Sequence, residues 1–394
     1  MRLVALGDVG VVDGMIHIGD EAMSEALILA MRARGATAVT ALSSAPADTA
    51  TRYGVDAVAP IGFAGLTRAA MAERLERVSA AAAGDAGALP ADDPAHAVIA
   101  AVAAADGVVV AGGGNLASTW PMHVFERAAL GRIARVLGRP LVISGQTLGP
   151  HLVDADATLL GELLAGARLV GLREDASDRL AARLGVEAPR RTRTPDDAAF
   201  LPSAPLPPRS PYCLVVLARH SGDVPSEDAV AALARLLEHV AATTGLDLVC
   251  SAHFGSLRGD LRGDDLVHTA VADRLRADAR IEPVVDARTS AALARQADLV
   301  VTSRYHPAVF GASATPVIGV AVDAYTRVKL DGALGTFGQS SVLDLADLVA
   351  GVDVRIGTIW AARERLRAAS AEVAAGRRAE AERWWDRVAD ALSP

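Results

Sequence analysis

The sequence ADLVVTSRYHP, residues 297–307, places a short apolar run directly before an arginine and a histidine. Residues 299–301 are typical of a buried parallel strand, and Pro307 is typical of the first turn of a helix. Arg304 and His306 are therefore predicted to lie at the carboxyl end of a strand. In open α/β sheets this edge binds ligands, and the N-terminus of the helix that follows favours anions.

Arg304 and His306 are two side chains that suit chemistry on an anion. A guanidinium pairs with carboxylate or phosphate through a planar fork, and an imidazole can carry a proton near neutral pH. If this end of the strand stays extended, both side chains leave the backbone on the same side. The alternative is a surface arginine beside a histidine that caps the helix, and this run alone favours neither interpretation.

Length and composition restrict the class of protein. The chain has 394 residues, of which 51% are hydrophobic, and this is enough for two domains that each have a core. A formal net charge of −8 and scattered arginines argue against nucleic-acid binding. The chain starts with a predicted strand instead of a signal peptide, and no apolar run reaches the roughly 18 residues of a membrane span. We therefore expect a cytoplasmic protein without a transmembrane segment.

Cysteine and lysine usage gives two further indications. Cys213 and Cys250 each lie in an apolar, strand-like run, so we predict small buried side chains and not a disulfide or metal pair. The His, Cys and carboxylate residues show no metal-ligand spacing, so we expect no bound metal. Lys329 is the only lysine among 39 basic residues, which hints at a need for a compact ammonium, with chance as the alternative.

Apolar runs alternate with amphipathic, Ala/Leu/Arg-rich stretches along the whole chain, and this pattern predicts parallel βαβ units. The longest expected helices of the first half cover 21–34, 67–83 and 124–137. The expected strands are 3–6, 38–42, 108–111, 141–144 and 169–172 in the first half, and 213–217, 246–250, 281–285, 299–301 and 317–320 in the second.

A proline-rich segment at 202–211 separates the two halves, because so many prolines can continue neither a helix nor a central strand. We predict a first Rossmann-like domain at 1–201, a linker at 202–211 and a second Rossmann-like domain at 212–357. The remaining residues, 358–394, are expected to form a C-terminal helix that crosses back and packs on the first domain.

Several predicted strands of the first half end in loops rich in glycine and polar residues. Consecutive glycines can point several N–H groups at one anion, although a tight turn explains them almost as well. Asp20, just before a helical run, also fits a helix N-cap. The glycine spacing matches neither a dinucleotide fingerprint nor a P-loop. These loops are GDVGVVDGMIHIGDEA at 7–22, GGGN at 112–115, SGQTLGP at 144–150 and GLREDAS at 171–177.

Together with PDDAAF at 195–200, SRYH at 303–306 and Lys329, these loops resemble the motifs of the polysaccharide pyruvyl transferase family. Their order and spacing match that family over about residues 5–335, although the family usually has asparagine where this chain has His17. The resemblance implies two Rossmann-like domains in a glycosyltransferase-B-like arrangement. It also implies transfer of the pyruvyl group of phosphoenolpyruvate to two hydroxyls of a sugar in a polysaccharide or glycan precursor, which forms a cyclic ketal and releases phosphate.

The resemblance extends to individual residues. The arginine and histidine of the family's Ser-Arg-x-His motif fall on Arg304 and His306, which are the expected catalytic residues. The arginine of the Arg-Glu/Asp-x-x-Ser motif falls on Arg173. The donor is expected to contact Arg173, Arg304, Lys329, Gly112, Gly113, Gly114 and Asn115, and the acceptor is expected to contact His17, Asp20, Gln146 and His253.

Ketal formation requires a proton donor and contacts to two anionic groups. The methylene carbon of the donor must be protonated, a cationic carbon must be stabilised, two hydroxyls must attack, and phosphate must leave. His306 is the group of the 297–307 stretch that can act as the acid near neutral pH and then as a base for a hydroxyl. Arg304 and Arg173 suit the carboxylate and phosphate, with Lys329 as a further charge.

The expected partners are phosphoenolpyruvate, as co-substrate with no other cofactor, and a sugar or lipid-linked glycan of the cell envelope, which leaves peripheral membrane association open. Two other functions stay open. A glycosyltransferase with a nucleotide-sugar donor would share the architecture and also place basic residues on a diphosphate. A non-catalytic sugar- or anion-binding protein would keep its function without the histidine.

Overall fold

The computed structural model describes residues 1–352 and 354–393, and it forms two compact units that are each built on a parallel sheet. Unit 1 comprises residues 1–12, 23–197 and 380–394, and unit 2 comprises 13–22 and 198–379. The boundary after Asp197 lies a few residues before the limit expected from the proline-rich segment. The grouping of residues 13–22 with unit 2 differs from the expected continuous first domain, 1–201. The domain limits as independent folding units stay a prediction.

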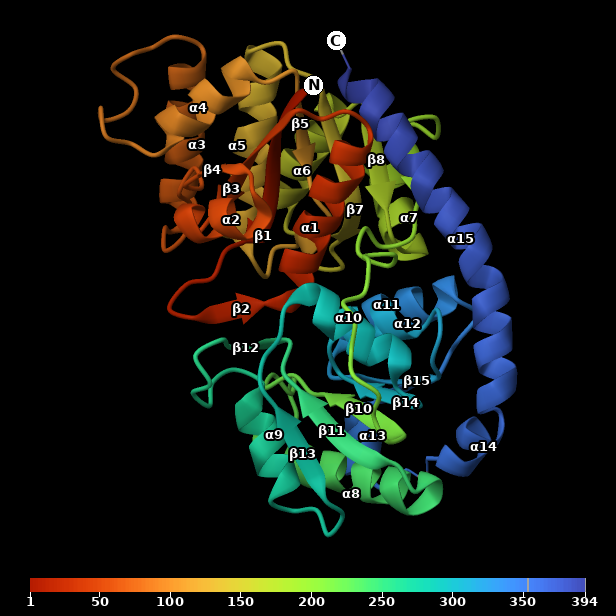
Figure 1. Cartoon of the computed structure of the whole chain (residues 1–394). Coiled ribbons are helices and arrows are strands. Elements are labelled where there is room, and N and C mark those ends of the chain that lie inside the picture. Colours follow the sequence, from red (N-terminus) through yellow and green to blue (C-terminus); the bar gives the residue numbers. More distant parts are fainter. Residues whose placement is uncertain (353, 394) are drawn as a thin grey trace. The chain divides into compact units, whose positions relative to one another are not determined.

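The sheet of unit 1 has the strand order β4-β3-β1-β5-β7-β8-β9, and β6 pairs with β7 (Figure 1). The chain starts in the middle at β1, extends to one side, and returns to build the other side from β5. The switch in direction therefore falls between β1 and β5. The strands are β1 (Arg2–Val9), β3 (Ala38–Ser43), β4 (Asp56–Val58), β5 (Gly107–Val110), β6 (Gly113–Leu116), β7 (Leu141–Leu148), β8 (Leu169–Leu172) and β9 (Arg191–Arg193).

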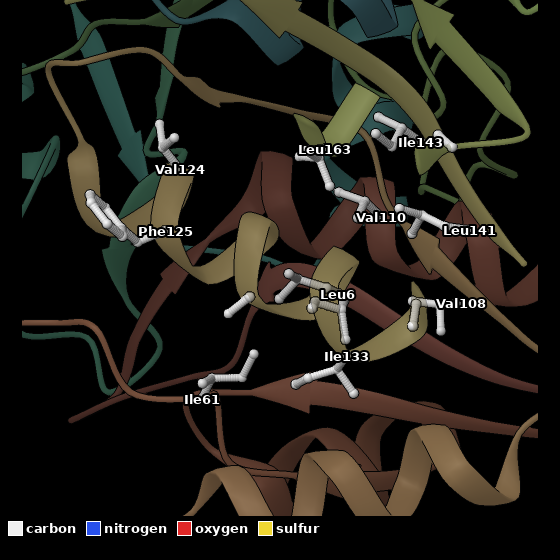
Figure 2. Close-up of a cluster of buried hydrophobic side chains, with 14 of the residues drawn as sticks. Leu6, Ile61, Val108, Val110, Val124, Phe125, Ile133, Leu141, Ile143 and Leu163 are labelled. Carbon is white, nitrogen blue, oxygen red and sulfur yellow. The ribbon is translucent and has the colours of Figure 1, made fainter. Parts of the chain in front are cut away.

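The helices of unit 1 cover these strands and supply much of its core. One buried cluster joins strand residues such as Val108 and Val110 to helix residues such as Val124 and Ile133 (Figure 2). Removing one such side chain from water contributes roughly 1.5–3 kcal/mol. The helices are α1 (Ile18–Ala33), α2 (Pro46–Tyr53), α3 (Arg68–Ala82), α4 (Ala95–Ala104), α5 (Pro121–Val136), α6 (Asp154–Gly166) and α7 (Asp175–Arg183).

Unit 2 repeats this plan with the strand order β13-β11-β10-β14-β15-β16, in which the switch falls between β10 and β14. Cys213 in β10 and Cys250 in β11 are buried free thiols, as predicted. The strands are β10 (Tyr212–Val216), β11 (Asp247–Ser251), β13 (Ala279–Glu282), β14 (Leu299–Thr302), β15 (Val317–Ala321) and β16 (Val342–Asp344). The helices are α8 (Ser226–Thr244), α9 (Asp265–Ala272), α10 (Ala287–Gln296), α11 (Tyr305–Gly311), α12 (Ala324–Thr336), α13 (Leu345–Val349) and α14 (Ile356–Ala361).

A short antiparallel ribbon in unit 2 was not predicted. It pairs β2 (Met15–His17) with β12 (Phe254–Ser256), and His17 lies opposite Phe254. The Ile18 N–H donates to the carbonyl of His253 (2.9 Å), which continues the pairing into the start of α1. The segment 13–22 therefore belongs by its hydrogen bonds to the second half of the sequence.

The last helix, α15 (Arg363–Leu392), starts in unit 2 and ends in unit 1. Trp384 and Val388 are buried in a cluster with Leu3, Leu27 and Val142 of unit 1. The Trp384 indole N–H donates to Ser144 Oγ (2.8 Å), and a Cβ on Gly171 would lie 2.6 Å from its ring. Glycine at 171 is thus required for this close packing.

The parallel α/β class with two Rossmann-like units confirms the expected fold, and all ten predicted strands are present within a few residues. Among the described residues, no helix combines the length and the apolar character that crossing a membrane would require.

Candidate functional site

Arg304 lies between the end of β14 and the start of α11, as predicted from the sequence. Thr302 Oγ1 accepts a hydrogen bond from the Arg304 N–H (2.9 Å), and the Arg304 backbone is extended (φ −95°, ψ 147°). The helix begins at the next residue, Tyr305, so the expectation that Arg304 and His306 share one face of an extended strand is wrong. His306 instead occupies the first turn of α11.

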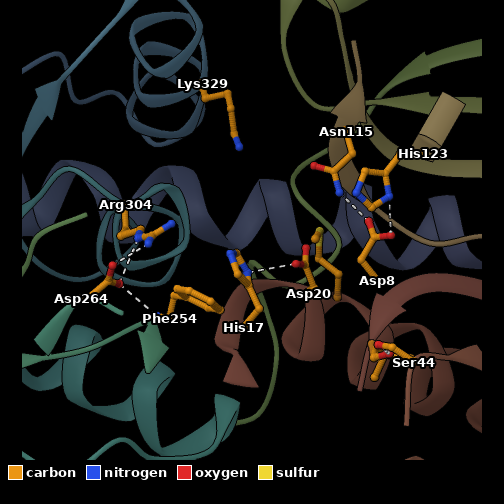
Figure 3. A network of polar contacts seen from close by, with 12 residues as sticks. Asp8, His17, Asp20, Ser44, Asn115, His123, Phe254, Asp264, Arg304 and Lys329 are labelled. Carbon is orange, nitrogen blue, oxygen red and sulfur yellow. Dashed lines mark hydrogen bonds and ion pairs between the residues drawn. The ribbon is translucent and has the colours of Figure 1, made fainter. Parts of the chain in front are cut away.

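The Arg304 guanidinium is held by a buried carboxylate (Figure 3). Its Nε donates to Asp264 Oδ2 (3.0 Å) and its Nη2 donates to Asp264 Oδ1 (2.5 Å). The Asp264 side chain is fully buried, and burial alone would raise its pKa, but the charge and hydrogen bonds of Arg304 outweigh burial and hold the pKa below its usual range. This bidentate contact uses one edge of the fork and leaves the Nη1–Nη2 edge for an anion.

His306 is buried and packed among aromatic rings and backbone. Its ring centroid lies 5.1 Å from that of Tyr305 and 6.0 Å from that of Phe310. A Cβ placed on Gly19, in the first turn of α1, would come within 2.0 Å of His306 Nδ1. The imidazole thus lies directly against the Gly19 backbone, within unit 2. A side chain at position 19 would therefore displace the imidazole from its present position.

His253, predicted to contact the acceptor, is 3% exposed, and its Nε2 is hydrogen-bonded to Ser290 Oγ (2.6 Å). Burial lowers its pKa well below the usual value, and the neighbouring His306, Arg304 and His17 lower it further, against the opposing effect of Asp264. The lowered pKa keeps this imidazole neutral, so His253 does not suit the role of a proton donor. The predicted contact of His253 with the acceptor stays a prediction.

His17 and Asp20, the other acceptor candidates of unit 2, contact each other. His17 Nδ1 lies 2.9 Å from Asp20 Oδ2, and the His17 side chain is 46% exposed. The His17 ring centroid lies 5.4 Å from that of Phe254, its partner across the β2–β12 ribbon. This pair offers an exposed polar surface next to an aromatic ring, which is an arrangement suited to a sugar.

Lys329, in α12, lies beside two tyrosines. Its Nζ is 4.8 Å from the Tyr305 ring centroid and 4.7 Å from the Tyr325 ring centroid, and it donates to the Tyr325 hydroxyl (3.1 Å). Tyr305 is the residue between Arg304 and His306. Unit 2 therefore brings the ammonium into contact with the same short segment that carries the arginine and the histidine.

Arg173, in unit 1, differs from the expected donor contact. Its Nη1 donates to Asp196 Oδ2 (2.7 Å), its Nε donates to Thr147 Oγ1 (2.8 Å), and the side chain is 1% exposed. A guanidinium buried with a carboxylate of its own unit is already paired, and replacing that partner by a ligand would leave Asp196 uncompensated. In the structure Arg173 ties β8 to the 194–197 segment, and its contact with the donor stays a prediction.

The run Gly112–Asn115 also differs from the expected anion cradle. The Gly112 N–H donates to Asp197 Oδ2 (3.0 Å), and Gly113–Leu116 form β6, which pairs with β7. The Gly112 N–H is therefore already bonded within unit 1, and the contact of this run with the donor stays a prediction. Gln146, an expected acceptor contact, is fully buried, and its Nε2 donates to the Ala111 carbonyl (2.5 Å).

Asp197 is a buried carboxyl group that the sequence did not mark as ionisable near neutral pH. Burial raises its pKa to about 7 and the Asp196 carboxylate adds to the rise, while hydrogen bonds from Ser144 and Gly112 and the Arg173 charge oppose it. The Ser144 hydroxyl lies 2.8 Å from Asp197 Oδ1. A Cβ on Gly145, whose φ is +49°, would lie 2.7 Å from the same carboxyl group.

A second polar cluster of unit 1 was missed by sequence reasoning. Asp8 at the end of β1, Asn115 in β6 and His123 in α5 meet through their side chains (Figure 3). Arg127, also in α5, forms an ion pair with Asp8. No local signal could reveal this cluster, because its members are spread over about a third of the chain. Asp8 and Asn115 each lie in a segment that the sequence marked as polar, but the partner histidine sits inside a predicted helix.

Comparison with solved structures supports the fold. A UDP-GlcNAc 2-epimerase from Neisseria meningitidis, solved with UDP-GlcNAc, has a TM-score of 0.56 at 9% identity and covers 89% of this chain and 90% of its own. The S. aureus protein MnaA, solved with UDP, has a TM-score of 0.57 at 12% identity (94% and 91%). The calicheamicin glycosyltransferase CalG4 has a TM-score of 0.54 at 17% identity (99% and 98%).

These likenesses and the polar clusters around Arg304 and Asp8 at the strand ends define the class. The chain is an α/β protein of two Rossmann-like units, with the fold of glycosyltransferase-B enzymes. The sequence model of the polysaccharide pyruvyl transferase family matches residues 17–324. The chain therefore belongs to the polysaccharide pyruvyl transferase family. No curated protein matches the chain.

Replacing Asp197 by asparagine is expected to make stability less dependent on pH. The folded-state pKa, about 7, lies above the unfolded value of roughly 4, so this carboxyl group stabilises the fold fully below pH 4 and loses that contribution as pH rises through 7. Asparagine mimics the protonated form. The variant should gain stability relative to wild type between pH 5 and 8, by on the order of a few kcal/mol.

Urea unfolding at several pH values measures this difference. Asp92→Asn, which changes an exposed carboxylate of the same unit, is the matched control and should show no such trend. A constant difference between Asp197→Asn and wild type across this pH range would contradict the raised pKa.

Proposed function

We propose that this member of the family transfers the pyruvyl group of phosphoenolpyruvate to two hydroxyls of a sugar, forms a cyclic ketal and releases phosphate. The observation that carries the proposal is the Arg304–His306 segment of unit 2. There a guanidinium fixed by the buried Asp264, an imidazole held against Gly19, and the Lys329 ammonium are joined by contacts through one short turn.

The donor carries two anionic groups, and this turn supplies two cations for them. The Nη1–Nη2 edge of Arg304 suits bidentate contact with a carboxylate or a phosphate. Because Asp264 fixes the other edge, little further ordering of the arginine is needed when the donor binds. Lys329 is a compact charge suited to the second anion.

His306 is the proposed acid that protonates the methylene carbon of the donor. Protonation at that carbon leaves positive character on the neighbouring carbon, which a sugar hydroxyl then attacks. The His17–Asp20 pair and the Phe254 ring are the proposed sugar contacts in unit 2, since hydroxyls bind polar groups and the apolar face of a sugar packs on an aromatic ring.

Activity assays test the reaction directly. The protein is incubated with phosphoenolpyruvate and a panel of p-nitrophenyl hexosides, phosphate release is followed, and products are analysed by mass spectrometry for a gained pyruvyl ketal. Glycans from a strain that lacks the protein, searched for a missing ketal, would direct the choice of acceptor. Consumption of a UDP-hexose with no use of phosphoenolpyruvate would replace this proposal by a glycosyltransferase, and binding without turnover would leave a binding protein.

Arg304→Ala is expected to weaken phosphoenolpyruvate binding by roughly ten- to a hundredfold, because one charge-assisted contact of about 1.5–3 kcal/mol is lost. Calorimetry with phosphoenolpyruvate measures the affinity. The single variant leaves Asp264 buried without its partner, so the double variant Arg304→Ala/Asp264→Asn is the matched control for that charge. Unchanged donor affinity in both variants would remove Arg304 from the donor site.

His306→Gln is expected to lower kcat by roughly 10²–10⁴ with nearly unchanged donor affinity, because protonation of carbon is the difficult step. Phosphate release gives the rate, and calorimetry gives the donor affinity. Wild-type turnover by this variant, or loss of donor binding alone, would make His306 a positioning residue.

Gly19→Ala is expected to lower kcat without changing phosphoenolpyruvate affinity by more than a fewfold. The new methyl group would overlap His306 Nδ1, so the ring must move. The contact between Arg304 and Asp264 does not involve this overlap. Ala22→Gly, at a buried position of the same helix, controls for a general change in α1. Full activity of Gly19→Ala would show that the reaction does not depend on the present ring position.

A further inference from the structure

A cavity of about 260 Å³ lies within unit 2, between the sheet and the helices α8, α9 and α13 (Figure 1). The same helices build the apolar core on this face of the sheet. Much of the cavity wall is apolar and comes from four elements: Val230 and Leu233 in α8, Val267 in α9, Val320 in β15 and Leu345 in α13. An apolar wall of this kind suits a hydrocarbon group.

The cavity reaches the carboxyl ends of two strands beside the switch point of the sheet. Ala218 follows β10 and Ser303 follows β14, and both residues line the cavity. The Ala218 N–H donates to Ser303 Oγ (2.7 Å), which ties the two strand ends together. Ligands of parallel α/β sheets bind at this edge. The proposed donor residues, 304, 306 and 329, do not line the cavity, so it is a second candidate site of unit 2.

Small side chains make room for the cavity. Ala229 in α8 and Ala270 in α9 line it, at positions where a larger apolar side chain would fill the space. Protein interiors are packed as densely as organic crystals, so a space of this size beside a core requires positions that are kept small. A cavity of about 150 Å³ with apolar walls takes up benzene, so this one has room for a hydrocarbon group of roughly eight carbon atoms.

The loop that borders the cavity, 218–225, is held in place by its own hydrogen bonds and by β15. Ser221 Oγ donates to the Val224 carbonyl (2.8 Å), and the Val224 N–H donates to the Ser221 carbonyl (3.2 Å). Gly222 has a φ of +63°, and a Cβ at this position would overlap the carbonyl oxygen of Val322. Glycine therefore lets the loop lie directly against the end of β15. An entrance that is already formed needs little further ordering when a ligand binds.

The charged residues that line the cavity are both basic. Arg219 and His220 are exposed, and among the described residues no acidic side chain lines the cavity. His220 Nε2 lies 3.6 Å from Asp323 Oδ2, whereas Arg219 forms no ion pair within the part of the chain that the structure describes. The Arg219 guanidinium is therefore available to a ligand, and its planar fork suits a carboxylate or a phosphate.

We propose that this cavity binds a small amphipathic anion, whose hydrocarbon group fills the apolar space and whose carboxylate or phosphate contacts Arg219. An ion without a hydrocarbon group would leave the apolar walls without a partner, and a neutral hydrocarbon would leave the guanidinium without one. The ligand must therefore carry both parts. The inference goes beyond the proposed function and does not depend on it, because binding is measured without any reaction.

Calorimetry of the full chain with four probes tests the ligand class: octyl phosphate, octanoate, octanol and inorganic phosphate. We expect octyl phosphate, octanoate or both to bind at least tenfold more tightly than octanol and inorganic phosphate, since one charge-assisted contact changes affinity by roughly ten- to a hundredfold. The probe that binds more tightly shows which anion is preferred. Equal affinity for octanol or for inorganic phosphate, or binding of no probe, would overturn the proposal.

Three variants locate the binding site. Ala229→Leu and Ala270→Leu add bulk to the cavity, and Arg219→Gln removes its charge, so each should weaken binding of the preferred probe at least tenfold. Arg276→Gln, at an exposed arginine of unit 2 outside the cavity wall, is the matched control and should keep the wild-type affinity.

The donor-site variant Arg304→Ala separates this cavity from the proposed donor site and should also keep the affinity for the probe. Loss of probe binding in Arg304→Ala together with wild-type binding in Arg219→Gln would place the probe in the donor site, and the inference would be wrong. Thermal melting shows whether the leucine variants are folded. Arg219 is exposed, so Arg219→Gln decides the question where they are not. None of these outcomes bears on the transfer of a pyruvyl group.

Discussion

The parallel strands at the centre of each unit are buried on both faces, and this constraint determines where polar side chains can lie. All residues of β5, β10, β14 and β15 are buried. Parallel sheets covered by helices on both sides have no solvated face, so charged groups collect where the strands end. Asp8 and Arg304 both follow this rule, one at the end of β1 and the other at the end of β14, each beside the switch point of its sheet.

The charged side chains at these strand ends are already paired with other side chains of the protein before a ligand binds. Asp264 holds Arg304 by two hydrogen bonds, and Arg127 holds Asp8. Removing one member of such a buried pair costs more than the pair contributes, because the remaining charge stays uncompensated. The pairs therefore fix orientation more than they add stability: Asp264 holds the Nε–Nη2 edge of Arg304 and leaves the Nη1–Nη2 edge for a ligand. A group that is fixed in this way loses little further conformational entropy on binding.

The sequence predicted the strands well, because apolar runs of four to six residues bounded by polar residues have few other interpretations. It placed Arg304 and His306 correctly at a strand end for the same reason. The sequence analysis failed where contacts between two distant segments determine the structure. The β2–β12 ribbon joins residues 15–17 to 254–256, and each strand alone is too short to give a pattern. Arg173 and Asp196 carry motif-like signals, yet their mutual pairing is visible only in the fold.

The sequence by itself determined the α/β class, the order of the strands along the chain and the family, since local hydrophobic patterns and motif residues carry that information. Only the tertiary structure decided which charges meet. Gly19 contacts His306 across almost three hundred residues, and Asp8 meets His123 across more than a hundred. Such contacts depend on strand order within a sheet and on the register of helices against it. No local pattern encodes them, and the physical result, such as the His306 ring packed against the Gly19 backbone, exists only once the chain has folded.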